Sequence, residues 1–157
     1  SRLDVLVFQT EPLEEDVEVT GPVIVKLWIS SSAVDTDFTA KLIDVYPPSE
    51  DYPEGYALNL TDGILRVKFR DSWERSELMT PDEVYQVEVG LLPISNLFVK
   101  GHRIRLDISS SNFPRFDVNG NTGENPGTSP VRITALNSVY HDEGRPSHVL
   151  LPVMPAD

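Results

Sequence analysis

The densest group of residues that could do chemistry lies in SSSNFPRFDVNGNTG, residues 109–123. Within it, DVNGNTGE (Asp117–Glu124) has the D-x-N-x-N spacing of a calcium loop. A helix–loop–helix calcium site needs glycine at the sixth position and glutamate at the twelfth, where this chain has Thr122 and Thr128. That motif is rejected, which leaves a non-helical calcium site built from Asp117 and backbone carbonyls as an open alternative. A phosphate cradle is rejected too, because no helix and no lysine follow these glycines.

A second candidate is DTDFT, residues 35–39, which spells the D-x-D-x-T of phosphoaspartyl phosphatases. That chemistry places the first aspartate at the end of a buried parallel strand, as a nucleophile beside magnesium. Here SSSAV precedes the motif and an alternating strand pattern follows it. The match is interpreted as coincidence, and Asp35 and Asp37 are expected to bind turn amides before the strand begins.

Nucleophilic serine catalysis has no visible basis, because the chain contains no G-x-S-x-G motif. The three histidines, His102, His141 and His148, are each expected to be surface or hydrogen-bonded structural residues. A glycosidase-type carboxylate pair stays open, since nothing singles out two of the 25 acidic residues. No catalytic residue, cofactor or metal ligand is assigned.

The aromatic and basic side chains of the same loop are more informative. Pro114 fixes the backbone between two phenylalanines, and Asn119 can hold an irregular loop by bonding backbone groups. Three roles stay open: the rings plug the end of this domain's own core, they form an interface or pocket wall, or they stack on a sugar. The candidate interface or cleft-wall residues are Asn112, Phe113, Arg115 and Phe116.

Composition narrows the class of protein. The 157 residues fit one domain with a hydrophobic core, at 39% hydrophobic content. A net charge of −12 argues against nucleic-acid and membrane partners, and the acidic run Glu11–Val19 is expected to be a solvated edge, with a calcium site as the minority alternative. The absence of cysteine excludes disulfides and favours a reducing, cytoplasmic compartment. The start at Ser-Arg-Leu, which enters a strand-like pattern at once, indicates a piece of a longer polypeptide.

Hydrophobic residues alternate with period two along most of the chain, which predicts strands. Turns are expected at Thr20–Pro22 and Thr61–Gly63, and one or two helical turns over Ser72–Met79. About eight strands without a βαβ rhythm predict an all-β, antiparallel jelly-roll sandwich. The expected strands span residues 23–30, 37–46, 63–70, 84–92, 102–110, 131–141 and 148–153.

Four blocks in this order carry a family resemblance: DTDFTAKLIDVYP, LTDGILRVKFR, SNLFVKGHRIRLDISSSNFPRFDVNGNTG and ALNSVYHDEGRPSHVLLPVMP. They resemble the C-terminal domain of the CocE/NonD hydrolases, which include cocaine esterase, α-amino-acid ester hydrolases and X-Pro dipeptidyl-peptidase-type enzymes. The resemblance covers residues 3–155.

The resemblance implies a galactose-binding-like jelly roll, residues 1–157, packed on an α/β-hydrolase domain with a helical cap in the same polypeptide. It places the catalytic triad in that upstream domain. Whether the protein forms a homo-oligomer is left open. The function it implies is a non-catalytic accessory domain that shapes the cleft or the assembly. The alternative is a carbohydrate-binding module, for which Trp28 and Trp73 are the candidate contacts.

Overall fold

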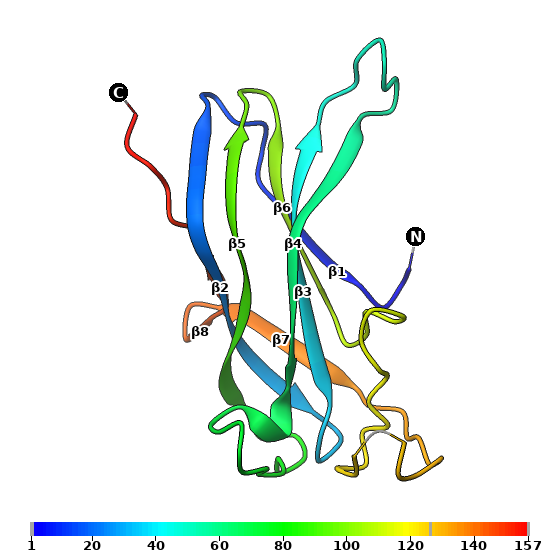
Figure 1. Ribbon diagram of the computed structural model, residues 1–157. Helices are drawn as coiled ribbons and strands as arrows, with labels where there is room; N and C mark the ends of the chain where they lie inside the picture. The colour runs from blue at the N-terminus through cyan, green and yellow to red at the C-terminus, as the bar shows by residue number, and fades with distance from the viewer. Residues whose placement is uncertain (1, 126, 157) are drawn as a thin grey trace.

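Two antiparallel β-sheets stack face to face in the computed structural model (Figure 1), which describes residues 2–125 and 127–156. The first sheet has the order β1-β6-β3-β4, with bounds Leu6–Gln9, Arg103–Ser109, Asp37–Tyr46 and Tyr56–Arg66. The second has the order β5-β2-β7-β8, with bounds Tyr85–Phe98, Val17–Ser31, Asn137–Asp142 and Arg145–Pro146, and β9 (His148–Leu150) also pairs with β2. Apart from the β3–β4 hairpin, strands β1 to β7 alternate between the sheets. The predicted all-β sandwich is confirmed.

The core lies between the sheets and follows the predicted alternation. On β2, Val23, Val25, Leu27 and Ile29 are all at most 2% exposed, and they face a matching set on the other strands. Burying each such side chain stabilises the fold by about 1.5–3 kcal/mol. The remaining fully or nearly buried residues include Phe38, Ala40 and Leu42 of β3, Val87 and Val89 of β5, and Ile108 of β6.

Two of the predicted turns are wrong, because both lie inside strands. Thr20–Pro22 belongs to β2, where Gly21 has a φ of +131° and the pairing with β5 shifts between Gly21 and Val23. Thr61–Gly63 belongs to β4, which pairs with β3 across this segment. In β2 the glycine forms a bulge, and in β4 the glycine allows a close contact with another strand. Because neither segment reverses the chain, both strands start earlier than predicted.

The segment after β4 also differs from expectation. The strand predicted over residues 63–70 ends at Arg66, and a 3₁₀ turn, η1 (Val67–Phe69), follows it. The helical turns predicted over Ser72–Met79 are wrong, since that segment is irregular. The strand predicted over residues 131–141 begins only at Asn137. In the described part of the chain, no helix is long and apolar enough to cross a membrane.

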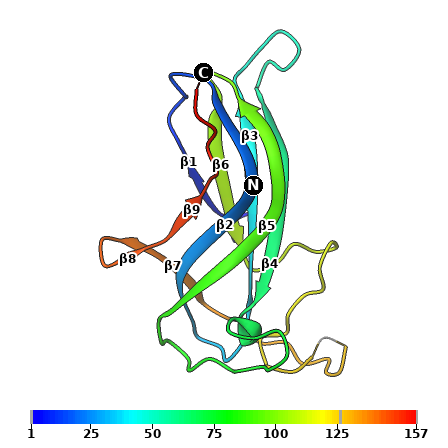
Figure 2. The ribbon, with the colours of Figure 1, turned by 60° about the vertical axis from the view of Figure 1, so that its left-hand side comes forward.

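Along one side the two sheets approach closely at β4 and β5, which lie next to each other in both ribbon views (Figures 1 and 2). The hydroxyl of Thr61 donates a hydrogen bond to the carbonyl of Leu92, at 2.9 Å. At Gly63, a Cβ atom would lie 2.4 Å from the carbonyl oxygen of Gly90. The sandwich therefore closes here only because residue 63 has no side chain.

This contact gives a first prediction with a built-in control. Gly63→Ala should lower the free energy of unfolding by about 1–3 kcal/mol, because the backbone of β5 has to move away from the added methyl group. Gly90→Ala should change it by less than about 0.5 kcal/mol, since a Cβ at that residue meets no atom within 4 Å. Urea denaturation of both variants measures the difference, and equal effects would contradict the close approach of the strands.

Candidate functional site

The connection between β6 and β7, which carries the candidate residues, is tied to the sandwich by two buried carboxylates. Asp35 is 0% exposed and Asp37 is 1% exposed. The side-chain amide of Asn119 donates to both of them, to Oδ2 of Asp35 at 3.0 Å and to Oδ1 of Asp37 at 2.8 Å. Its own Oδ1 accepts the backbone N–H of Asn121 at 2.8 Å. One asparagine thus joins the loop to the start of β3.

Two basic residues complete this anchor, one at the last position of β4 and one in η1. Arg66 donates two hydrogen bonds to Asp37, from Nε at 2.9 Å and from Nη2 at 3.0 Å. Lys68 donates its backbone N–H to Oδ1 of Asp35 at 3.0 Å. The Nζ atom of Lys68 reaches the loop and donates to the carbonyl of Gly123 at 3.2 Å and to Oδ1 of Asn125 at 2.9 Å. Buried carboxylates are stable only when such partners surround them.

Burial raises the pKa of Asp35 above its ordinary value of 3.8, although the hydrogen bonds from Asn119 and from the backbone of Lys68 oppose that shift. Asp37 lies nearby, and its negative charge raises the pKa of Asp35 further. The hydrogen bond that Arg66 donates to Asp37 raises the pKa of the guanidinium. In this cluster the two carboxylates repel each other, and the side-chain amide of Asn119 offsets that repulsion by donating uncharged N–H groups to both.

The structure corrects the expected role of Asp35 and Asp37. Neither binds an amide of its own turn: Asp35 accepts from Lys68 and Asn119, and Asp37 accepts from the side chains of Arg66 and Asn119. The basic residues of this cluster were missed because strict alternation over residues 63–70 predicts them on the strand face opposite Leu65 and Val67. Instead the chain turns into η1 after Arg66, and Lys68 becomes 3% exposed. The rejection of phosphatase chemistry agrees with this arrangement.

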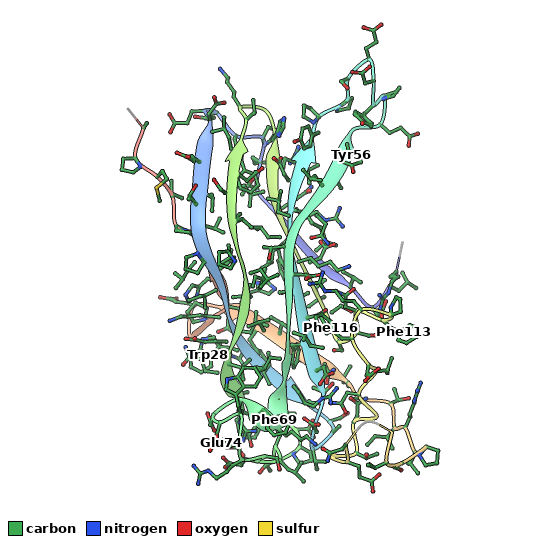
Figure 3. All side chains as sticks on the ribbon, viewed as in Figure 1. Trp28, Tyr56, Phe69, Glu74, Phe113 and Phe116 are labelled. Carbon is green, nitrogen blue, oxygen red and sulfur yellow. The ribbon has the colours of Figure 1, made fainter. Side chains whose placement is uncertain are left out.

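The four predicted interface residues lie on one stretch of this loop and share a second attachment point, Asp62 of β4. Asn112 donates to Oδ2 of Asp62 at 3.3 Å, and Nη2 of Arg115 lies 3.1 Å from its Oδ1. Asp62 is 6% exposed, so the contact fixes the loop to the sheet. Phe113 is 67% exposed and projects away from the strands, whereas Phe116 is half-buried and lies close to them (Figure 3). Phe113 therefore does not plug the core.

The calcium hypothesis gains no cluster of ligands. Within residues 2–125 and 127–156, no three histidine or acidic side chains come together in a group that could hold a metal ion. Asp117 is exposed. A site made from Asp117 and backbone carbonyls stays an untested prediction.

The histidines occupy structural or surface positions, as predicted. Nδ1 of His102 lies 2.8 Å from Oδ1 of the fully buried Asp44, whose Oδ2 accepts a hydrogen bond from Asn96 at 3.2 Å. This resembles the acid–base half of a serine triad. Among the hydrogen bonds of the described residues, however, no hydroxyl joins the ring of His102. His141 and His148 are both exposed.

Of the two tryptophans considered for sugar contacts, Trp28 of β2 is half-buried, as the alternation suggests. Trp73 is 83% exposed and lies in the irregular segment after η1.

Comparisons with known proteins agree with this picture of a domain without catalytic machinery. The family model described as the X-Pro dipeptidyl-peptidase C-terminal non-catalytic domain matches residues 1–150. Cocaine esterase from Rhodococcus sp. (strain MB1 Bresler) is 44% identical over 155 residues, which cover 98% of this chain and 26% of the esterase. The chain thus spans about a quarter of the length of this relative.

Two solved structures superimpose closely on the sandwich. An aminopeptidase from the marine sediment archaeon Thaumarchaeota archaeon is 32% identical, with a TM-score of 0.92 over 99% of this chain and 26% of the aminopeptidase. An α-amino acid ester hydrolase is 35% identical, with a TM-score of 0.91 over 98% of this chain and 26% of the hydrolase. The predicted resemblance to CocE/NonD hydrolases is confirmed, while the likeness to galactose-binding domains stays a prediction.

The anchor predicts that Asn119→Ala will lower the free energy of unfolding by about 2–4 kcal/mol, because two buried carboxylates lose a donor. Asn59→Ala, on the exposed face of β4, is the matched control and should change it by less than about 0.5 kcal/mol. Urea denaturation measures both values. If the two variants behave alike, Asn119 does not hold the loop.

A second prediction concerns protonation. Because the pKa of Asp35 is raised in the folded state, its contribution to stability falls as the pH rises from 3.8 through the folded pKa and is constant above it. Carbon-13 NMR of the Asp35 carboxyl group should show titration above 3.8. Asn119→Ala should raise this pKa further, because the amide stabilises the charged form. A titration at or below the ordinary value would contradict the burial of this group.

Proposed function

Because the chain belongs to the family of X-Pro dipeptidyl-peptidase C-terminal non-catalytic domains, we propose that it is the accessory domain of a CocE/NonD-type serine hydrolase. In that enzyme it packs on an α/β-hydrolase domain in the same polypeptide and shapes the catalytic cleft or the assembly. The family match over residues 1–150 is the observation that carries the proposal. The commitment of the chain's buried acidic groups to structural hydrogen bonds supports it.

The reaction of the whole enzyme is the hydrolysis of an acyl ester or an amide. This class is common to the three relatives named above: an esterase, an aminopeptidase and an amino acid ester hydrolase. A serine of the catalytic domain attacks the carbonyl carbon, an acyl-enzyme forms as the alcohol or amine leaves, and water then releases the acid. Backbone N–H groups stabilise the oxyanion in both steps. No residue of the present chain takes part in bond making or breaking.

The contribution of this chain is positional. The loop with Asn112, Phe113, Arg115 and Phe116 is held at Asp62 and, further along, by Asn119. Holding a loop in its bound conformation before contact reduces the entropy lost on binding. An exposed aromatic ring on a fixed loop suits an interface or the wall of a cleft, and we assign Phe113 to that role.

Activity assays test the proposal directly. The 157-residue chain should hydrolyse neither p-nitrophenyl esters nor X-Pro p-nitroanilides, whereas the longer polypeptide that contains it should hydrolyse at least one of these substrates. In the longer polypeptide, Phe113→Ala should lower kcat/KM or the thermal midpoint. The matched control is Tyr52→Ala. Tyr52 is also aromatic, is 51% exposed and lies in the β3–β4 hairpin at the opposite end of the sandwich. This variant should change neither kcat/KM nor the thermal midpoint.

Turnover by the 157-residue chain, abolished by one serine substitution within it, would overturn the proposal. So would a longer polypeptide without any hydrolase domain.

A further inference from the structure

The sequence contains a single asparagine–glycine pair, Asn119–Gly120, and this pair lies in the buried anchor of the β6–β7 connection. Such a pair is chemically labile in water, because the backbone nitrogen of the second residue can attack the side-chain amide of the first. Glycine has no Cβ atom to hinder that attack, and its backbone adopts the required conformation easily. Asparagine therefore counts among the thermolabile residues of proteins.

The anchor requires asparagine at residue 119. Its Nδ2 atom donates to the carboxylates of Asp35 and Asp37, and its Oδ1 accepts the backbone N–H of Asn121. An amide supplies two N–H donors and one acceptor on the same short side chain, whereas an ionised carboxylate only accepts. An acid at residue 119 could not make the two contacts that hold the loop to β3.

The fold also requires glycine at residue 120. A Cβ atom there would lie 2.8 Å from the carbonyl oxygen of Val131. Two hydrogen bonds hold the backbones at this distance: the carbonyl of Gly120 accepts the N–H of Ile133 at 3.0 Å, and Nδ2 of Asn121 donates to the carbonyl of Ile133 at 2.9 Å. Two separate contacts, one at each residue, thus select the labile pair.

The same contacts protect the pair while the loop is closed. Asn119 is 7% exposed, and three hydrogen bonds hold its amide group. The reaction expels the NH₂ group, so Nδ2 has to give up its contacts with Asp35 and Asp37. Deamidation therefore needs a local opening of the loop, and its rate follows the population of the open state.

We propose that Asn119 is a modification site, at which deamidation converts a transient opening of the loop into a permanent one. The nitrogen of Gly120 gives its proton to water or hydroxide and bonds to Cγ of Asn119, and the amide nitrogen leaves as ammonia. Water then adds to either carbonyl carbon of the five-membered succinimide ring and opens it to aspartate or isoaspartate. Water is the only co-reactant, and nothing is oxidised or reduced.

Neither product can close the loop again. Aspartate at residue 119 offers no N–H group to Asp35 and Asp37, and it brings a third negative charge to their buried site. Isoaspartate has the same defect and also lengthens the backbone by one carbon atom. Loss of the donor and repulsion between like charges both favour the open loop. One event thus ends the ordered state of the β6–β7 connection, whether or not a hydrolase domain is attached.

The test follows deamidation of the 157-residue chain at mildly alkaline pH. Mass spectrometry of the tryptic peptide that spans residues 116–132 measures how fast each asparagine becomes an acid. In the urea-unfolded chain Asn119 should react first, and in the folded chain it should react at least about tenfold more slowly. Asn121 and Asn125 lie in the same peptide and are the internal controls, since threonine and proline follow them and make the attack slower.

A variant that loosens the loop without touching the labile pair tests the role of opening. Lys68→Met removes the hydrogen bonds from Nζ to Gly123 and Asn125, and it should increase the deamidation rate of the folded chain about tenfold. Lys26→Met is the matched control, because its Nζ atom contacts Glu88 between β2 and β5, and it should leave the rate unchanged. Circular dichroism checks that both variants are folded.

Asn119→Asp makes one of the products directly. It should increase the rate at which trypsin cuts after Arg115 and Arg132 by about tenfold or more, because the loop is open. Asn121→Asp adds the same charge outside the buried cluster and should have a much smaller effect. Equal cleavage of the two variants would overturn the permanent release. Reaction at Asn119 that is no faster than at Asn121 in urea, or equally fast in the folded and unfolded chains, would overturn the modification site.

Discussion

The structure depends on the side-chain amide of Asn119 lying between the carboxylates of Asp35 and Asp37. The residues are more than 80 positions apart in sequence, yet they meet inside the protein. Two like charges in a buried site repel each other and lose hydration, at a cost of several kcal/mol unless donors replace the water. Asn119 and Arg66 supply donors to this pair, and Lys68 adds a backbone N–H. The D-x-D and N-x-N patterns therefore form one buried hydrogen-bonded cluster, in which the first supplies the acceptors and the second a donor.

This device decides how the long β6–β7 connection can be used. A connection of this length without regular structure would be mobile if only its ends were fixed. Here it is bound at Asp62 near its beginning, at Asn119 in its middle and by Ser32 near its end at Leu136. Between these points Phe113 and Leu136 stay exposed. The buried polar contacts thus hold apolar groups ready for a partner, which joins the stability of the sandwich to its accessory function.

The sequence allowed the sandwich and the inward faces of its strands to be predicted, because period-two alternation has one simple physical meaning. Val23, Val25, Leu27 and Ile29 lie where the pattern places them. The predictions of turns from glycine were wrong at two positions. Gly21 forms a bulge and Gly63 allows a close contact between strands, and neither reverses the chain. Local propensity cannot distinguish these uses, because the deciding neighbour is on a distant strand.

The candidate site could be predicted only in part, for the same reason. The loop was identified from its composition, but its anchor was not. The partners of Asn119 are set by tertiary folding, and a single sequence carries no sign that residue 119 meets residues 35 and 37. The carboxylate of Asp62 and the buried pair of Asp44 and His102 were missed in the same way. Polar residues in strands were interpreted by their period alone, which predicts the side of the sheet and not the partner.

The acidic residues that imitate catalytic sites, Asp35, Asp37 and Asp44, have carboxylate oxygens that are already engaged. A nucleophilic carboxylate needs an oxygen that is free to approach substrate. In Asp35 and Asp37 each of the four oxygens accepts a hydrogen bond from Asn119, Arg66 or Lys68. Asp44 is engaged likewise, with one oxygen on His102 and the other on Asn96. What makes the domain non-catalytic is therefore not a shortage of reactive residue types. The buried acids serve the fold, and exposed apolar side chains such as Phe113 and Leu136 remain available for contact.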